Sequence, residues 1–241
     1  MRTKHQTDRL LMTLVLLGLP IFLSLDSVWL SQYFSHGQMV ANVIMIFFYC
    51  GFLAVSNSKL RWIILLMTVI GFFGEILGSI IMTLYRYRLE NIPIYVPLGH
   101  AVIFITIYHL CRQPWLWRHH VNVEKILHIL ILTVSLGSLI LYKDIFGFNC
   151  YLLFLVFIRN KVKPLFYLML FAMVYYLEIV GTRYASWTWY NVLGNHMDYF
   201  TTANPPCGVA GLYMVFDMLS NYIYLFFKLK FKEREQISLP T

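Results

Sequence analysis

Hydrophobic residues along this chain form long, almost uncharged runs, and short charged or proline-containing segments separate them. A transmembrane helix needs about 20 mostly apolar residues to cross the hydrocarbon core of a bilayer. Eight runs are candidates for such helices: 10–31, 38–53, 62–84, 92–111, 126–142, 145–158, 165–189 and 206–227. The run 145–158 is the shortest, and it crosses only if the bilayer thins or the flanking Lys143 and Arg159 side chains extend to the interface. The pattern predicts an all-α fold, a polytopic bundle of about eight transmembrane helices.

Composition supports a membrane protein and excludes a water-soluble globule. Hydrophobic residues make up 59% of the chain and charged residues only 12%, which is far from the balance found in soluble domains. Since no polar or low-complexity stretch marks off a soluble domain, we expect residues 1–241 to form a single integral membrane domain.

Lys and Arg residues gather in alternate connections between the runs, mainly at 2–9, 59–61, 112–125, 159–163 and 228–234. Positively charged connections remain on the cytoplasmic side of a membrane. We therefore expect both termini in the cytoplasm, and the compact chain without eukaryotic sorting signals suggests the inner membrane of a bacterium. The same distribution accounts for the net charge of +8, so we predict no nucleic-acid partner.

One motif occurs twice. Glu75 is followed by a glycine at the third position, a small hydroxyl residue at the fourth and a tyrosine at the twelfth, and the same residue types follow Glu178 at the same distances. A second motif, P-x-G-x-A, comes after each of them, at 97–101 and 206–210. Internal repeats of this kind are typical of membrane folds built from two related halves. Because each half holds an even number of predicted helices, we predict two parallel four-helix repeats, about 10–111 and 124–228.

Acidic residues inside the predicted helices are the first candidates for chemistry. Glu75 and Glu178 each lie about ten residues, or roughly 15 Å, below the outer end of a predicted helix. Asp217 is expected at a similar depth in the last helix. Buried carboxyl groups inside a membrane are costly and usually functional, although a protonated acid also serves as a hydrogen bond between helices. We predict that these three acids share one site, where mutual repulsion and desolvation make a general acid.

His100 lies in the first P-x-G-x-A motif, where it could act as a base, a proton shuttle or simply a structural hydrogen-bonding residue. Trp187 and Trp189 are expected on one helix, so at most one of them should face inward. Aromatic residues at these positions could also form an interfacial belt. Catalytic candidates are therefore the three acids and His100, and candidate substrate contacts are Asp26, Tyr85, Trp187, Asn204 and Tyr213.

No metal or cofactor motif is apparent. The sequence lacks the His and carboxylate spacing that places two metal ligands on one helical face, and it lacks a phosphate-binding loop. We predict no metal and no cofactor, with a haem between two facing His residues left open. The segment 191–205, which joins the last two predicted helices, is a candidate lid because functional residues concentrate in long loops.

The order E-x-x-G, then Y-x-Y or W-x-W, then a proline-rich segment resembles the carotenoid-biosynthesis integral membrane family, which contains carotenoid hydratases. The resemblance covers 75–97 and 178–206. It implies addition of water to a terminal isoprenoid double bond, with an intramembrane carboxylic acid protonating the alkene.

These observations favour a membrane-embedded enzyme that acts on a lipid or isoprenoid by carboxylic acid and base chemistry, as a hydratase or isomerase does. Its partner would then be a membrane lipid or isoprenoid. Two alternatives remain open. The paired acids could bind a proton or cation in a small transporter, or they could join helices in a structural membrane subunit.

Overall fold

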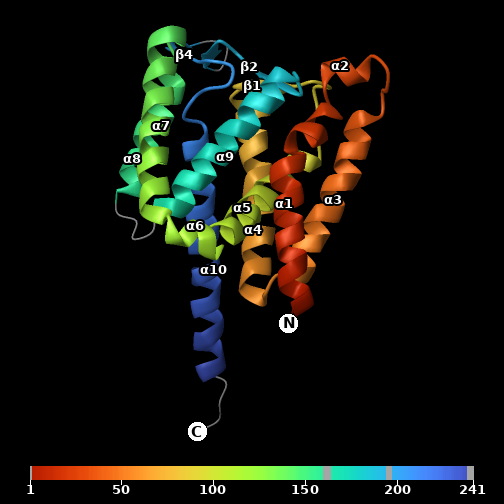
Figure 1. The fold of residues 1–241 in the computed structure, drawn as a ribbon, viewed down its shortest axis with the longest axis vertical. Coiled ribbons are helices and arrows are strands. Elements are labelled where there is room, and N and C mark those ends of the chain that lie inside the picture. Colours follow the sequence, from red (N-terminus) through yellow and green to blue (C-terminus); the bar gives the residue numbers. More distant parts are fainter. Residues whose placement is uncertain (1, 160–163, 194–196, 238–241) are drawn as a thin grey trace.

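Long helices form a bundle in the computed structural model of the chain, which describes residues 2–159, 164–193 and 197–237 (Figure 1). The long helices are α1 (Arg2–Ser24), α3 (Gly37–Val55), α4 (Ser58–Glu75), α5 (Tyr95–Leu110), α7 (His120–Tyr142), α8 (Ile145–Ile158), α9 (Pro164–Arg183) and α10 (Ala210–Ile237). Two short helices, α2 (Val28–Ser31) and α6 (Pro114–Arg118), lie in connections, and α4 continues directly into a π-helix, η1 (Ile76–Ile81).

Six helical segments of the described residues are long and apolar enough to cross a membrane, as expected for a multi-pass membrane protein: Gln6–Ser24, Gly37–Val55, Ser58–Ile81, His120–Tyr142, Pro164–Arg183 and Ala210–Leu229. Two shorter apolar helices, Tyr95–Leu110 and Ile145–Ile158, occupy the fourth and sixth predicted runs. The count of eight crossings therefore stays a prediction. Helix α1 begins and α10 ends at the same end of the bundle (Figure 1), so the two ends share a side, and which side this is stays a prediction. Residues 160–163, part of one expected cytoplasmic connection, lie outside the described residues.

Helices at corresponding places in the two halves make corresponding contacts. Helix α4 packs against α5 as α9 packs against α10, and α3 packs against α5 as α8 packs against α10. Between the halves, α4 packs against α10 and α9 packs against α5. This arrangement places the ends of α4 and α9 near each other, while the duplication of whole four-helix units stays a prediction.

Two predicted helices end earlier than the hydrophobic runs suggested. The third run continued to 84 and the seventh to 189, but their helices end at Ile81 and Arg183. Strands β1 (Tyr85–Tyr87) and β2 (Trp187–Trp189) follow them and form an antiparallel pair, so only β2 lies within a predicted run. In each case the backbone leaves the helix through a residue with positive φ, Thr83 at 47° and Ala185 at 52°. Left-handed residues of this kind break a helix, which is why the apolar run does not continue as one.

The predicted loop 191–205 also contains regular structure. Strands β3 (Val192–Leu193) and β4 (Met197–Thr201) pair in a second antiparallel sheet, and residues 194–196 between them lie outside the described residues. The fold is therefore mostly helical, as predicted, but not entirely so, because two small sheets cover one end of the bundle (Figure 1).

Candidate active site

A cavity of about 350 Å³ lies among α1, α3, α4, α5, α9 and α10. Its walls are mostly aliphatic and aromatic side chains, and its polar groups include Glu75, Glu178, His100 and Tyr213. The doubled motif thus places both of its glutamates on one cavity. An apolar cavity with a few convergent polar groups is the usual form of a small-molecule site.

Three side chains surround the carboxyl group of Glu75. The Tyr85 hydroxyl donates to Oε2 at 2.6 Å, the Tyr87 hydroxyl donates to the same oxygen, and Nε2 of His100 lies 2.9 Å from Oε1. All of these groups are buried. Hydrogen bonds donated to a carboxylate stabilise its ionised form, so the surroundings of Glu75 suit a carboxylate.

The two tyrosines are held as hydrogen-bond donors. Burial raises the pKa of both phenols well above the ordinary tyrosine value, and the negative charge of Glu75 raises it further. Tyr85 and Tyr87 therefore keep their protons at neutral pH. Tyr85 is one of the predicted substrate contacts and lines the cavity, but the sequence did not single out Tyr87 as a partner of Glu75.

Glu178 has a different set of partners. The indole N–H groups of Trp187 and Trp189 both donate to Oε2, at 2.8 and 3.0 Å. Among the described residues, no group donates a hydrogen bond to Oε1 of Glu178. The expectation that only one of the two tryptophans faces inward was wrong. These residues lie on a strand, where side chains two positions apart point to the same face.

Glycines make room for these aromatic partners. A β-carbon added to Gly78 would lie 2.9 Å from the Tyr85 hydroxyl, and one added to Gly181 would lie 2.0 Å from the Trp187 ring. Each glycine follows its glutamate by three positions, so it lies on the same helical face. The small residues of the motif therefore serve close packing of an aromatic side chain against the acid's own helix.

The two motifs correspond with a shift of one residue, not at identical distances as the sequence comparison assumed. Glu178 lies 103 positions after Glu75, whereas Trp187 lies 102 positions after Tyr85. The extra residue is taken up by η1, where the Met82 amide bonds to the Leu77 carbonyl, five residues back. Tyr85 and Tyr87 thus correspond to Trp187 and Trp189. Tyr87 and Tyr190 still match in the sequence, each twelve positions after its glutamate, but Trp189 and not Tyr190 donates to Glu178 as Tyr87 donates to Glu75.

His100 lies in a tightly packed corner of the cavity. A β-carbon on Gly71 would lie 2.8 Å from its ring, and the rings of Tyr213 and Phe216 pack against it with centroid distances of 4.6 and 5.4 Å. Among the described residues, its buried Nδ1 atom has no hydrogen-bond partner. Nε2 is therefore the ring nitrogen through which His100 bonds to a neighbour, and that neighbour is Glu75.

Asp217 is buried but takes no part in the cavity wall. Its Oδ2 accepts a hydrogen bond from the Tyr167 hydroxyl at 2.8 Å, and its Oδ1 accepts one from the Asn221 amide at 2.7 Å. The structure thus brings two of the three predicted acids together at the cavity. Similar depth does not fix the direction in which a residue points around its helix.

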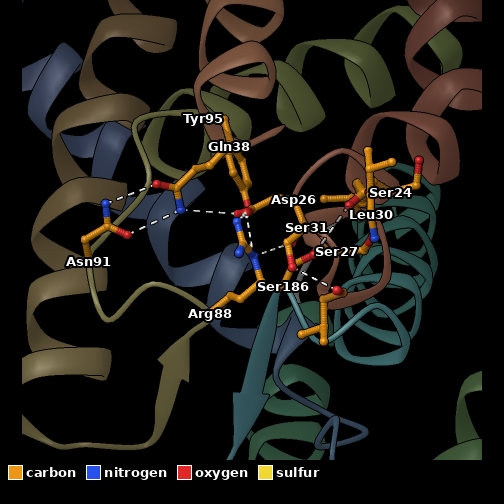
Figure 2. Close-up of polar contacts among 12 residues, drawn as sticks. Ser24, Asp26, Ser27, Leu30, Ser31, Gln38, Arg88, Asn91, Tyr95 and Ser186 are labelled. Atoms are coloured by element: carbon orange, nitrogen blue, oxygen red, sulfur yellow. Dashed lines mark hydrogen bonds and ion pairs between the residues drawn. The ribbon is translucent and has the colours of Figure 1, made fainter. Parts of the chain in front are cut away.

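Asp26 also lies away from the cavity wall, in a polar network that Figure 2 shows. Its carboxylate pairs with Arg88 at 2.5 Å and accepts hydrogen bonds from Tyr95 at 2.9 Å and Gln38 at 3.3 Å. Since these partners come from α3, α5 and the segment after β1, Asp26 joins the connection between α1 and α2 to those three elements. This placement favours a structural role over the predicted substrate contact.

The remaining predicted contacts divide in the same way. Trp187 and Tyr213 line the cavity. Asn204 does not, and its side-chain oxygen accepts a hydrogen bond from the Trp189 backbone amide at 3.1 Å. Asn204 therefore supports strand β2, which presents the two tryptophans to Glu178.

Metal ligands do not gather at this site or elsewhere in the described part of the chain, where no group of three His, Cys, Asp or Glu residues could hold a metal ion. Comparison of the chain with protein-family models, with curated proteins and with solved structures finds no match.

Proposed function

We propose that this protein is a membrane-embedded enzyme that acts on a lipid or isoprenoid by proton transfer, adding water to a carbon–carbon double bond or moving it. One observation carries the proposal. Two carboxyl groups line one apolar cavity with different partners: Glu75 is held by three side chains, and Glu178 keeps one oxygen free of hydrogen bonds among the described residues.

This difference divides the roles of acid and base. A protonated Glu178 gives its proton from Oε1 to one carbon of the double bond, and the other carbon becomes cationic. Glu75 accepts a proton either from the water that attacks the cationic carbon or from the neighbouring carbon, and this proton returns to Glu178 before the next turnover. The first outcome is hydration and the second is double-bond migration, and both balance without an oxidant or reductant. Aromatic faces of Trp187 and Tyr213 stabilise the positive charge.

The cavity walls suit a neutral, apolar reacting group. No Lys or Arg is among the residues that line the cavity, so nothing there pairs with a phosphate or carboxylate as these groups require. Two acids in the same cavity also repel an anion. The reacting end of the substrate is therefore a hydrocarbon, and any charged headgroup stays outside the cavity.

The test is mass spectrometry of total lipid extracts from membranes that contain the wild type, the variant Glu178→Gln or no protein. We expect a lipid whose mass or retention time changes with the wild type and returns to baseline with Glu178→Gln. The matched control is Asp217→Asn, another buried acid in a membrane helix but outside the cavity wall. It should keep the activity.

The same variants separate the competing functions. A lipid profile that the folded wild type leaves unchanged, together with proton or cation flux into vesicles that Glu178→Gln abolishes, would replace the enzyme with a transporter. Loss of an assembly partner with both variants would instead indicate a structural subunit.

A further inference from the structure

Helices α1 and α3 face each other through matching stripes of residues. On α1 the stripe contains Leu11, Leu14, Gly18 and Ile21, which recur at the three- and four-residue spacing of one helical face, and Leu25 continues it just after the helix ends. On α3 it contains Gly37, Ile44, Phe48 and Gly51, in the opposite chain direction.

The two helices touch closely at both ends of this stripe. A β-carbon on Gly51 would lie 3.4 Å from the Leu11 side chain, which is ordinary contact, and one on Gly37 would lie 1.8 Å from the Leu25 carbonyl oxygen. Between these contacts, 14 residues of α1 extend over about 21 Å. The two helices are therefore in contact at both ends of the stripe. At the Gly37 end, only glycine permits so close an approach.

The middle of the stripe is open. A β-carbon on Gly18 would meet none of the described atoms of neighbouring elements within 4 Å. Gly18, Ile44 and Phe48 line the cavity. So do Leu14 and Ile21, although 47% and 73% of their surfaces remain exposed on the outside of the bundle. The cavity therefore reaches the outer surface along this face of α1.

We propose that the gap at Gly18 between α1 and α3 is a lateral window through which a hydrocarbon chain from the bilayer reaches Glu75 and Glu178. The occupant follows from the surroundings. Both helices are among those apolar enough to cross a membrane, so the window opens into the hydrocarbon core and not into water. That the chain belongs to the substrate rests on the proposed function, whereas the path itself does not.

Tryptophan fluorescence tests the path without any need for turnover. Trp187 and Trp189 line the cavity and are buried, whereas the other four tryptophans of the chain are exposed. The four exposed residues to be replaced by phenylalanine are Trp29, Trp62, Trp115 and Trp117. Only Trp187 and Trp189, the pair in the cavity, then remain. The protein is reconstituted in vesicles of phosphatidylcholine, with or without bromine at carbons 9 and 10 of one acyl chain. Bromine quenches tryptophan on contact.

We expect the brominated chains to quench the pair, and we expect Gly18→Leu to abolish that quenching by filling the window. Ile44→Phe narrows the window from α3 and should have the same effect. The matched control is Gly137→Leu in α7. A β-carbon added there would likewise meet none of the described atoms of neighbouring elements within 4 Å, and Gly137 lies outside the cavity wall. It should leave the quenching unchanged.

Two results would overturn the inference: a pair that brominated chains do not quench, or quenching that both window variants leave intact. Neither depends on the lipid product, so the proposed function and the window fail separately. Quenching with an unchanged lipid profile would keep the window and remove the enzyme. A lipid product made equally well by Gly18→Leu, in which quenching is lost, would keep the path and the enzyme and show that the substrate enters by another route.

Discussion

Replacing Gly181 by alanine should destabilise the protein by displacing Trp187 from Glu178. The new β-carbon would lie 2.0 Å from the indole ring, and carbon atoms need about 3.5 Å, so the ring must move by about 1.5 Å. The indole nitrogen now lies 2.8 Å from the Glu178 oxygen, and such a shift breaks this hydrogen bond. Leaving the buried indole N–H without its acceptor costs about 1–3 kcal/mol, and overpacking costs about 1–3 kcal/mol.

Alanine also gains about 1 kcal/mol over glycine within a helix. The net result for Gly181→Ala is a loss of about 1–5 kcal/mol in the free energy of unfolding. Gly137→Ala is the matched control, because it gains the same helical preference and meets no described atom of a neighbouring element within 4 Å. Gly78→Ala should fall between the two, since its β-carbon would lie 2.9 Å from the Tyr85 hydroxyl.

The measurement is reversible unfolding in mixed detergent micelles with increasing dodecyl sulfate, followed by helical ellipticity. Emission of Trp187 and Trp189 reports the local change at the site. We expect the order of stability Gly137→Ala, then Gly78→Ala, then Gly181→Ala. Equal stability of Gly137→Ala and Gly181→Ala would refute the claim that position 181 must be glycine to make room for the indole ring.

Three further changes test other contacts. Arg88→Met leaves the Asp26 carboxylate buried without its cation and should lower the free energy of unfolding by about 3–5 kcal/mol. Adding Asp26→Asn should restore part of this stability in thermal melts. If the double variant is no more stable than Arg88→Met, the ion pair is not what stabilises the fold. Tyr85 and Tyr87 have pKa values raised above the usual value, so their contribution to stability is present below pH ~10 and is lost as the pH rises further. The double phenylalanine variant should lack both this alkaline loss and the late phenol ionisation in ultraviolet titration, and an unchanged titration would contradict the burial. Asp144→Ala removes the carboxylate that accepts hydrogen bonds from three backbone N–H groups. Each buried N–H group left without an acceptor costs about 1–3 kcal/mol. Hydrogen exchange at these amides should accelerate, and unchanged protection would show that other acceptors replace the Asp144 carboxylate.

The hydrophobic pattern predicted the long helices but not where two of them end. The runs that reach 84 and 189 carry few charged residues, so hydropathy alone continues them as helices. The signal that was missed is the alternation in Y-R-Y and W-T-W, which is the two-residue period of a strand. Arg86 and Thr188 occupy the outward positions of these strands. The polar residue between each pair of aromatic residues therefore indicated a strand with one outward and one inward face.

The doubled motif was enough to predict that Glu75 and Glu178 belong together, and both line the cavity. It could not exclude Asp217, because depth in the membrane was the only coordinate that the sequence supplied. Rotation about the helix axis decides which way a side chain points, and Asp217 points to Tyr167 and Asn221. The ion pair of Asp26 could not be predicted for a similar reason, since its partner Arg88 lies 62 residues away and no local pattern joins them.

The correspondence between the two motifs explains how one scaffold yields two different acids. The backbone contacts agree closely: the Arg88 amide bonds to the Ser186 carbonyl and the Tyr190 amide bonds to the Leu84 carbonyl, both at 3.0 Å. The difference lies in the side chains. Two phenols and an imidazole occupy both oxygens of one glutamate, whereas two indoles occupy a single oxygen of the other. A symmetric arrangement would give two equivalent acids that compete for one proton. Exchanging tyrosine for tryptophan at two positions, and placing a histidine beside only one glutamate, makes the pair unequal, and an unequal pair is what proton transfer across a double bond requires.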